Sequence, residues 1–148
     1  MKIYFAGPLF SEAEKEFNQI LCDKLESIGF NVFLPQRDGV EKEKPPYDTM
    51  PKEERRAAMF NLDKEKIFEC DIFLFILDGR VPDEGACMEL GLAYAHRELT
   101  KGKKTLVGLQ TDVRAAFLGS KLNPMIRVPM DYIAENETDL IEFFKSVR

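Results

Sequence analysis

Three carboxylates stand together where a buried strand is expected to lead into a helix. Asp83, Glu84 and Glu89 follow the apolar run 71–77 and belong to a helical run that continues to about Leu99. Glu89 has no charged neighbour one turn away, because the residues three and four positions distant are Gly85, Ala86, Leu92 and Ala93. A helical carboxylate without an ion-pair partner is a candidate for chemistry.

The other acidic residues can be explained by structural roles instead of chemistry. Asp83 suits the N-cap of the helix, and Glu84 is favoured in its first turn by the helix dipole. Asp63, in a separate helical run, has lysines beside it for a solvated ion pair. Capping does not explain Glu89.

Clustered carboxylates without histidine suit two kinds of chemistry, the binding of Mg²⁺ or Ca²⁺ and glycosyl transfer. Metal binding fits poorly, because Arg80 stands in the middle of the acidic segment 78–83. Glycosyl chemistry needs a carboxylate nucleophile below an anomeric carbon and a second acid at the leaving group. Glu89 fits the first of these roles, since the small Gly85 leaves space for a sugar ring.

Alternating strands and helices are expected to position these acids. The predicted strands are 2–6, 31–34, 71–77, 104–109 and 132–133. The predicted helices are 11–28, with a capping box at Ser11 and Glu14, 51–69, 83–99 and one that begins near Asn136. We expect a long loop over a site or an interface at 36–50, and an irregular segment with one helical turn at 110–130. The pattern predicts an α/β fold in a single domain, 1–148, with a flavodoxin-like doubly wound parallel sheet of four to five strands and helices on both faces.

Ligands of such sheets bind beyond the carboxyl ends of the strands, where the strand order reverses. If the first and third strands are neighbours, the loop 7–10 meets the acidic loop 78–84. The fold therefore predicts a site that contains both loops.

The composition of the chain limits the kinds of binding partner that it can have. The 148 residues carry a net charge of −5, which argues against a nucleic-acid polymer, and no apolar run is long enough for a membrane span. The N-terminal strand is too short for a signal peptide, and three widely spaced cysteines predict reduced thiols and a cytoplasmic location. Neither a P-loop nor a dinucleotide fingerprint is present, and the single histidine, His96, is expected on a helix surface.

Four elements of the chain, in order and over most of its length, resemble the nucleoside 2-deoxyribosyltransferase family. They are 4–10 (YFAGPLF), Asp63, 82–91 (PDEGACMELG) and 122–125 (LNPM). The resemblance implies a flavodoxin-like fold and a homo-oligomer built from dimers. It implies cleavage of the N-glycosidic bond of a 2′-deoxynucleoside and transfer of the sugar to another purine or pyrimidine base, without a metal or an organic cofactor.

The resemblance also implies the catalytic residues. Glu89 would hold the deoxyribosyl group covalently, Tyr4 would orient that carboxylate, and Asp63 would protonate the departing base. Two displacements at one carbon imply retention of configuration and ping-pong kinetics. Two carboxyl groups with separated pKa values suit these roles.

The same resemblance implies the substrate-binding residues. Asp83 would hold the base or the sugar, Gly7 would line the site, Phe10 would pack on the ligand and Gln36 would contact the base edge. Asn123 would bind the 5′-hydroxyl in a neighbouring subunit's site. Ordinary structural roles stay open for these residues, such as a turn at Asn123 or a strand terminator at Gly7.

Two other functions stay open. One is a hydrolase of 2′-deoxynucleoside 5′-monophosphates, which needs a phosphate pocket. The loop 7–11 is apolar and has no cation, which favours a neutral 5′-hydroxyl, although Arg114 and Arg127 offer charge from elsewhere. The other is a non-catalytic nucleotide-binding domain, which would not need Glu89.

Overall fold

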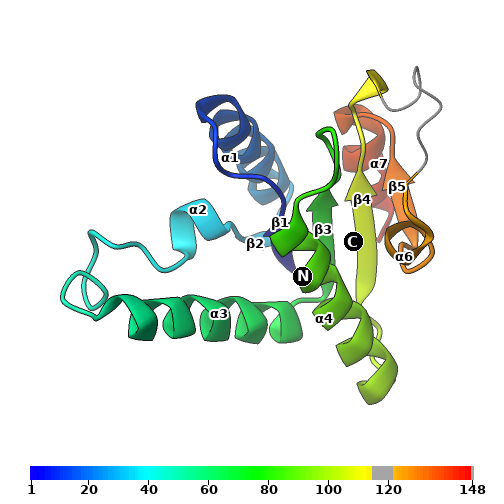
Figure 1. The fold of residues 1–148 in the computed structure, drawn as a ribbon. Coiled ribbons are helices and arrows are strands. Elements are labelled where there is room, and N and C mark those ends of the chain that lie inside the picture. The colour runs from blue at the N-terminus through cyan, green and yellow to red at the C-terminus, as the bar shows by residue number, and fades with distance from the viewer. Residues whose placement is uncertain (115–121, 148) are drawn as a thin grey trace.

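The computed structural model describes residues 1–114 and 122–147. Five strands form its sheet: β1 (Lys2–Ala6), β2 (Asn31–Phe33), β3 (Ile72–Ile76), β4 (Thr105–Leu109) and β5 (Tyr132–Ala134). Helices surround the sheet (Figure 1): α1 (Glu12–Ser27), α2 (Pro35–Asp38), α3 (Lys52–Glu69), α4 (Glu84–Thr100), α6 (Pro124–Arg127) and α7 (Glu137–Val147).

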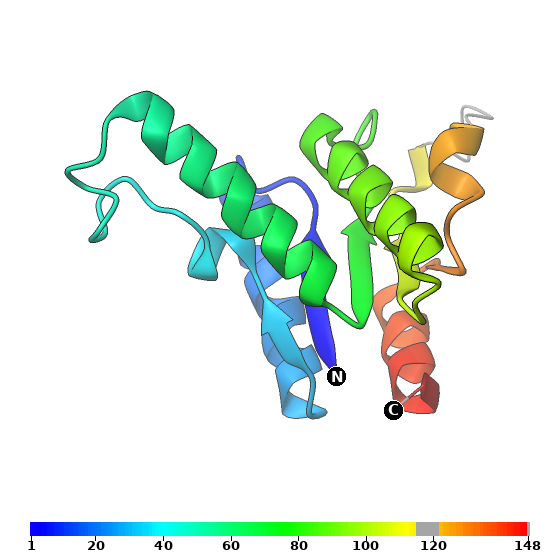
Figure 2. The same cartoon turned by 90° about the horizontal axis from the view of Figure 1, so that it is seen from below.

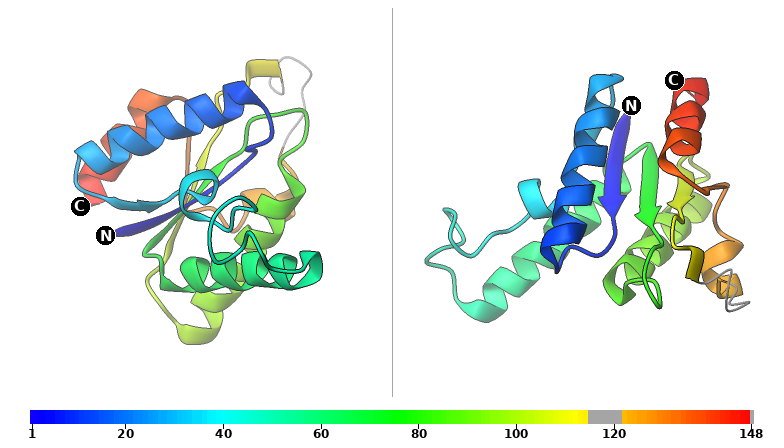
Figure 3. Two further views of the ribbon diagram at one scale, coloured as in Figure 1. Left: turned by 90° about the vertical axis from the view of Figure 1, so that its left-hand side faces the viewer. Right: turned by 90° about the horizontal axis from the view of Figure 1, so that it is seen from above.

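The sheet has the order β2-β1-β3-β4-β5, and every pair of neighbouring strands is parallel. Helices α1 and α7 cover one face, and α3 and α4 cover the other (Figure 3). This confirms the predicted flavodoxin-like α/β fold, with five strands. Since β1 lies between β2 and β3, the strand order reverses at β1, which makes the carboxyl ends of β1 and β3 the topological switch point.

Alternation along β1 divides its side chains between the two faces. Ile3 and Phe5 pack under α1 and α7, whereas Tyr4 faces α3 and α4 and is fully buried. The Tyr4 ring stacks between those of Phe33 and Phe73, with centroids 5.6 and 5.7 Å away. Neighbouring strands on both sides therefore hold the ring in place.

Local signals in the sequence set the helix ends as expected. Ser11 and Glu14 form the predicted capping box of α1, and Gly29, with φ 92°, follows its C-terminal end. Asp83 caps α4 by accepting a hydrogen bond from the backbone N–H of Ala86 at 2.8 Å. These caps fix where the loops at the switch point enter their helices.

The segment expected to be a loop at 36–50 departs from the prediction at its start. Pro35 occupies the first turn of the short helix α2, and Asp38 accepts a hydrogen bond from the backbone N–H of Leu34 at 2.9 Å. The helical turn expected within 110–130 is α6, while residues 115–121 lie outside the described part. Among the described residues, no helix is both long and apolar enough to cross a bilayer.

Candidate active site

A cavity of about 580 Å³ lies beyond the carboxyl ends of β1 and β3. The loop after β1, the α2 region, α3 and the start of α4 all contribute to its walls. Six of the eight predicted site residues line it: Gly7, Phe10, Gln36, Asp63, Asp83 and Glu89. The expectation that the loops after the first and third strands share one site is confirmed.

Gly7 lets the loop after β1 pass close to the end of β3. Its φ of +155° disfavours other residues, and a Cβ at this position would lie 2.9 Å from the Cβ of Ile76. A side chain at Gly7 would therefore push the loop away from β3 and change the shape of the cavity.

Tyr4 does not line the cavity itself, but it contacts Glu89, which does. The Tyr4 hydroxyl donates a hydrogen bond to Oε1 of Glu89 at 2.8 Å. Burial, together with the negative charges of Glu89 and Asp63, raises the pKa of Tyr4, so the hydroxyl keeps its proton and acts as a donor. Tyr4 is fully buried, and its hydroxyl reaches the carboxylate of Glu89 at the edge of the cavity.

The two carboxyl groups beside Tyr4 both hold protons more tightly than usual. Burial raises the pKa of Glu89 to about 7, against the lowering effect of the hydrogen bond from Tyr4, and the charges of Asp63 and Asp83 raise it further. Burial also raises the pKa of Asp63 to about 6, again opposed by Tyr4. Between about pH 6 and pH 7 the pair therefore carries about one proton in all, a property suited to acid–base chemistry.

Asp63, on α3, does not pair with Lys64 or Lys66, the lysines beside it in the sequence. Lys64 donates to Asn61, and Lys66 pairs with Glu69, so both lysines are engaged along the helix surface. Asp63 instead lines the cavity. Of the remaining acids, Asp78 accepts hydrogen bonds from the backbone N–H groups of Thr111 and Asp112, and Glu84 is exposed.

Asp83 both caps α4 and lines the cavity. Its Oδ1 caps α4 through Ala86, and the residue also lines the cavity, where its charge raises the pKa of Glu89. Phe10, on the loop after β1, also lines the cavity and is 76% exposed, so its ring is available to a ligand.

The side chain of Gln36 is held from two directions. Its Oε1 accepts a hydrogen bond from Nδ2 of Asn18 at 3.1 Å, and its Nε2 donates to the main-chain oxygen of Lys15 at 2.8 Å. Both partners lie on α1, so this helix fixes the amide that lines the cavity.

Asn123 lies outside this cavity. It caps the short helix α6 by accepting a hydrogen bond from the backbone N–H of Met125 at 2.9 Å, and its residue is exposed. A second hollow of about 410 Å³ contains Asn123 together with Gly91, Tyr94 and Met125. Within one chain, Asn123 is therefore separate from the carboxylates.

Sequence reasoning missed several residues that line the cavity: Lys15, Gly39, Val40, Glu41 and Met59. The signal available for Met59 was its position one helical turn before Asp63. Gly39, Val40 and Glu41 lie in the segment expected to cover a site, and this part of the expectation is confirmed. Lys15 supplies a cation that the loop 7–11 lacks.

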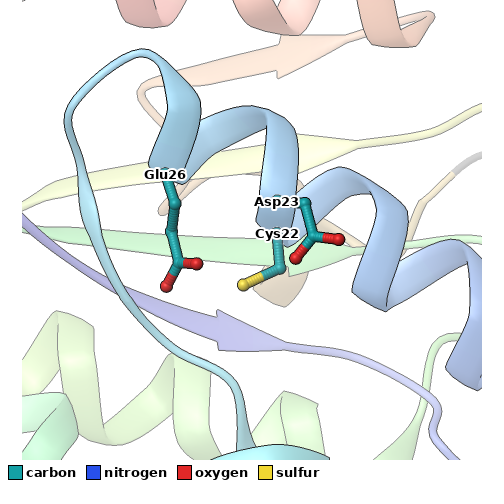
Figure 4. Close-up of side chains that lie close together, drawn as sticks. All are labelled: Cys22, Asp23 and Glu26. Atoms are coloured by element: carbon teal, nitrogen blue, oxygen red, sulfur yellow. The ribbon is translucent and has the colours of Figure 1, made fainter.

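One group of potential metal ligands lies elsewhere, on α1 (Figure 4). Among the described residues, ligand atoms of Cys22, Asp23 and Glu26 lie within 4.8 Å of one another. Arg37 holds Glu26 with two hydrogen bonds of 2.9 and 3.1 Å, and burial raises the pKa of Cys22 to about 11. A protonated thiol and an ion-paired carboxylate do not make a good site for a cation.

The fold and the cavity define a flavodoxin-like α/β protein with a carboxylate-rich ligand site at the topological switch point. Residues 3–139 match the family model described as nucleoside 2-deoxyribosyltransferase. The chain therefore belongs to the nucleoside 2-deoxyribosyltransferase family. No curated protein sequence matches it.

Solved structures agree with this assignment. A conserved protein from Enterococcus faecalis V583 is 27% identical with a TM-score of 0.76, and the match covers 100% of this chain and 99% of that one. A 2-deoxyribosyltransferase from Bacillus psychrosaccharolyticus is 25% identical with a TM-score of 0.75, over 95% and 90% of the two chains. A CMP N-glycosidase from Clostridium botulinum, 19% identical with a TM-score of 0.56 over 100% of both chains, shares the fold.

Proposed function

We propose that this protein is a nucleoside 2-deoxyribosyltransferase that moves the sugar of a 2′-deoxynucleoside to another nucleobase. The observation that carries the proposal is the hydrogen bond of 2.8 Å between Tyr4 and Glu89, in a cavity that Glu89 lines together with Asp63. The relative from Bacillus psychrosaccharolyticus, a 2-deoxyribosyltransferase, supports this choice of reaction.

The first step forms a covalent intermediate. A carboxylate oxygen of Glu89 attacks C1′ of the sugar, and the bond between C1′ and the base nitrogen breaks with its electron pair going to the base. Asp63 gives its proton to the base, which leaves as a neutral molecule. Tyr4 keeps the attacking carboxylate in place through its hydroxyl.

The second step reverses the first with a new base. A nitrogen of the acceptor attacks C1′, the ester bond to Glu89 breaks, and its electron pair returns to the carboxylate. Asp63 accepts the proton that the acceptor nitrogen loses. Each step inverts C1′, so the two together retain its configuration.

The protonation state that reacts has the shared proton on Asp63 and a charged Glu89. The pKa values of Asp63 and Glu89, about 6 and about 7, are close to each other, so either carboxyl group can hold that proton in the free protein. Placing it on Asp63 therefore costs little beside a reaction barrier. Catalysis is therefore compatible with the geometry at neutral pH.

We further propose that sites are shared in a homo-oligomer. Asn123 lies outside its own chain's carboxylate cavity, and exposed apolar side chains surround it, including Met125 at 81% and Val128 at 77% exposure. The N-terminal part of α3 and the segment before it extend beyond the sheet (Figures 1 and 2). A partner subunit would cover these surfaces and receive Asn123 at the 5′-hydroxyl.

Hydrolysis of 2′-deoxynucleoside 5′-monophosphates is the second candidate. The observation that favours it is Lys15, which lines the cavity and brings a positive charge to it. A cation there would suit a 5′-phosphate. Glu41 lines the same cavity and opposes this reading.

Incubation with a deoxynucleoside, with and without a second free base, separates the candidates. A new deoxynucleoside formed only when the second base is present supports the transferase. A parallel incubation uses a 2′-deoxynucleoside 5′-monophosphate, and formation of free base and 2-deoxyribose 5-phosphate regardless of acceptor supports the hydrolase. Binding without release of any base would leave a non-catalytic nucleotide-binding domain.

A further inference from the structure

The buried amide of Asn18, on α1, contacts Gln36, the residue expected to contact the base. Asn18 is 3% exposed, and its Nδ2 donates two hydrogen bonds, one to the main-chain oxygen of Pro8 at 2.9 Å and one to Oε1 of Gln36 at 3.1 Å. Both N–H groups of the Asn18 amide are therefore used, and each acceptor belongs to a segment that borders the cavity.

These contacts allow the Gln36 amide only one orientation. Its oxygen faces the N–H donor of Asn18, and its nitrogen faces the carbonyl acceptor of Lys15 at 2.8 Å. Rotating the amide by half a turn would set donor against donor and acceptor against acceptor, leaving polar groups unpaired. One N–H and one oxygen lone pair of Gln36 remain for a ligand.

An amide in a fixed orientation discriminates between nucleobases. A base edge presents an amino donor or a carbonyl acceptor, and a Gln amide pairs with a neighbouring donor and acceptor only when their order matches its own. A free amide turns to suit either order, whereas a fixed amide accepts one and opposes the other. The correct pair is favoured roughly tenfold or more.

We propose that Asn18 is a positioning residue that sets base selectivity by fixing the amide of Gln36. The inference rests on the proposed function, because it takes a nucleobase as the ligand beside Gln36. Asn18, although it lies outside the cavity, would thus influence which nucleobase binds. The choice is between amino-bearing bases, such as adenine and cytosine, and their carbonyl counterparts, hypoxanthine and uracil.

The test uses the selectivity ratio, meaning kcat/KM for adenine divided by that for hypoxanthine as acceptor, repeated with cytosine and uracil. This ratio does not depend on how much of a variant is folded, so a loss of stability in Asn18→Ala does not disturb it. The variants are Asn18→Ala, Gln36→Ala and the double substitution. Gln19→Ala removes a neighbouring amide of α1 that bonds Asp23 at the surface, and it serves as the control.

We expect at least one of the two comparisons, adenine with hypoxanthine or cytosine with uracil, to give a wild-type selectivity ratio of roughly 10 or more, or roughly 0.1 or less. Gln36→Ala should bring that ratio close to one, and Asn18→Ala should move it part of the way, because the Lys15 carbonyl still holds the amide nitrogen. The double variant should equal Gln36→Ala, because both residues act through one amide. Gln19→Ala should keep the wild-type ratio.

Three results would overturn the inference: wild-type ratios near one, an unchanged ratio in Asn18→Ala while Gln36→Ala changes it, or effects that multiply in the double variant. If Asn18→Ala yields no folded protein, Asn18→Ser, which is too short to reach Gln36, gives the same comparison. Absence of transfer by both wild type and Gln19→Ala refutes the proposed function and the inference with it, whereas active proteins with unchanged ratios refute the inference alone.

Discussion

The hydroxyl of Tyr4 donates a hydrogen bond of 2.8 Å to Oε1 of Glu89, a residue 85 positions further along the chain. Strand β1 supplies the donor, and helix α4 supplies the acceptor. The stacked rings of Phe33 and Phe73 hold the phenol from both sides, so the direction of the hydrogen bond is set by the sheet itself. The carboxylate of Glu89 is thereby fixed before any ligand arrives.

Removing this hydroxyl should slow the reaction and change its pH dependence. A hydrogen bond to a charged group contributes about 1.5–3 kcal/mol, so Tyr4→Phe should lower kcat/KM roughly 10- to 100-fold. Wild type should show a bell-shaped profile with limbs near pH 6 and 7, the pKa values of Asp63 and Glu89. Because the Tyr4 hydroxyl lowers both of these pKa values, its loss should move both limbs to higher pH.

Steady-state kinetics between pH 5 and 9, which reaches about one unit below the lower limb and about two units above the upper one, measures this effect. Tyr94→Phe, which alters a partly exposed tyrosine of α4, is the matched control and should leave both limbs unchanged. Limbs that stay in place in Tyr4→Phe would contradict the proposed link between Tyr4 and the carboxylates.

Glu89 should cost stability at alkaline pH. Its pKa in the folded protein, about 7, exceeds the ordinary 4.5, so the folded state binds the proton more tightly than the unfolded chain. The stability gained from that proton is full below about pH 4.5 and is lost as the pH rises through 7. Glu89→Gln should therefore exceed wild type in unfolding free energy at pH 8 by on the order of 2–3 kcal/mol, with a much smaller difference at pH 5.

Urea unfolding at the two pH values checks this prediction. Glu98→Gln changes an exposed acid of the same helix and should show no comparable pH-dependent gain. Equal stability of Glu89→Gln and wild type at pH 8 would mean that the Glu89 carboxylate is not held at a raised pKa.

Substitutions at Asp83 should separate its capping from its place in the cavity. Asparagine keeps an N-cap acceptor, so the unfolding free energy of Asp83→Asn should lie within a few tenths of a kcal/mol of the wild-type value. That of Asp83→Ala should be about 1 kcal/mol lower. If Asp83 holds the substrate, both variants should raise KM. Full activity of a stable Asp83→Asn protein would reduce Asp83 to a helix cap.

Mixing two impaired chains tests whether Asn123 serves a neighbouring site. Asn123→Asp keeps the oxygen that caps α6 and removes the amide donor, so it should weaken substrate binding without unfolding that turn. Mixed with Glu89→Gln, it should restore roughly a quarter of wild-type activity, since half of randomly paired dimers would carry one intact site of two. Confirmed mixed oligomers without recovery would count against shared sites.

Much of this architecture was predictable because its signals are local. The buried strand before the acidic loop is an unbroken apolar run, and Ser11 with Glu14 and Asp83 are caps whose partners lie within three residues. The isolation of Glu89 also follows from helical spacing alone. Such features depend on neighbours along the chain, which the sequence displays directly.

The parts that escaped prediction depend on contacts between distant segments. Asn18 and Gln36 are 18 residues apart and meet only because α1 packs beside α2. Val40 is buried over the cavity although its segment is polar and has no periodicity. The shared proton of Asp63 and Glu89 arises from burial, which the residue types alone do not specify.

The most direct test of the central claim is mass spectrometry of the protein after brief incubation with a 2′-deoxynucleoside and acid quenching. If Glu89 is the nucleophile, we expect a mass gain of one deoxyribosyl group on the peptide that contains Glu89, its loss on addition of a second base, and no gain in Glu89→Gln. Release of base by wild type without any adduct, or an equal adduct in Glu89→Gln, would contradict Glu89 as the nucleophile.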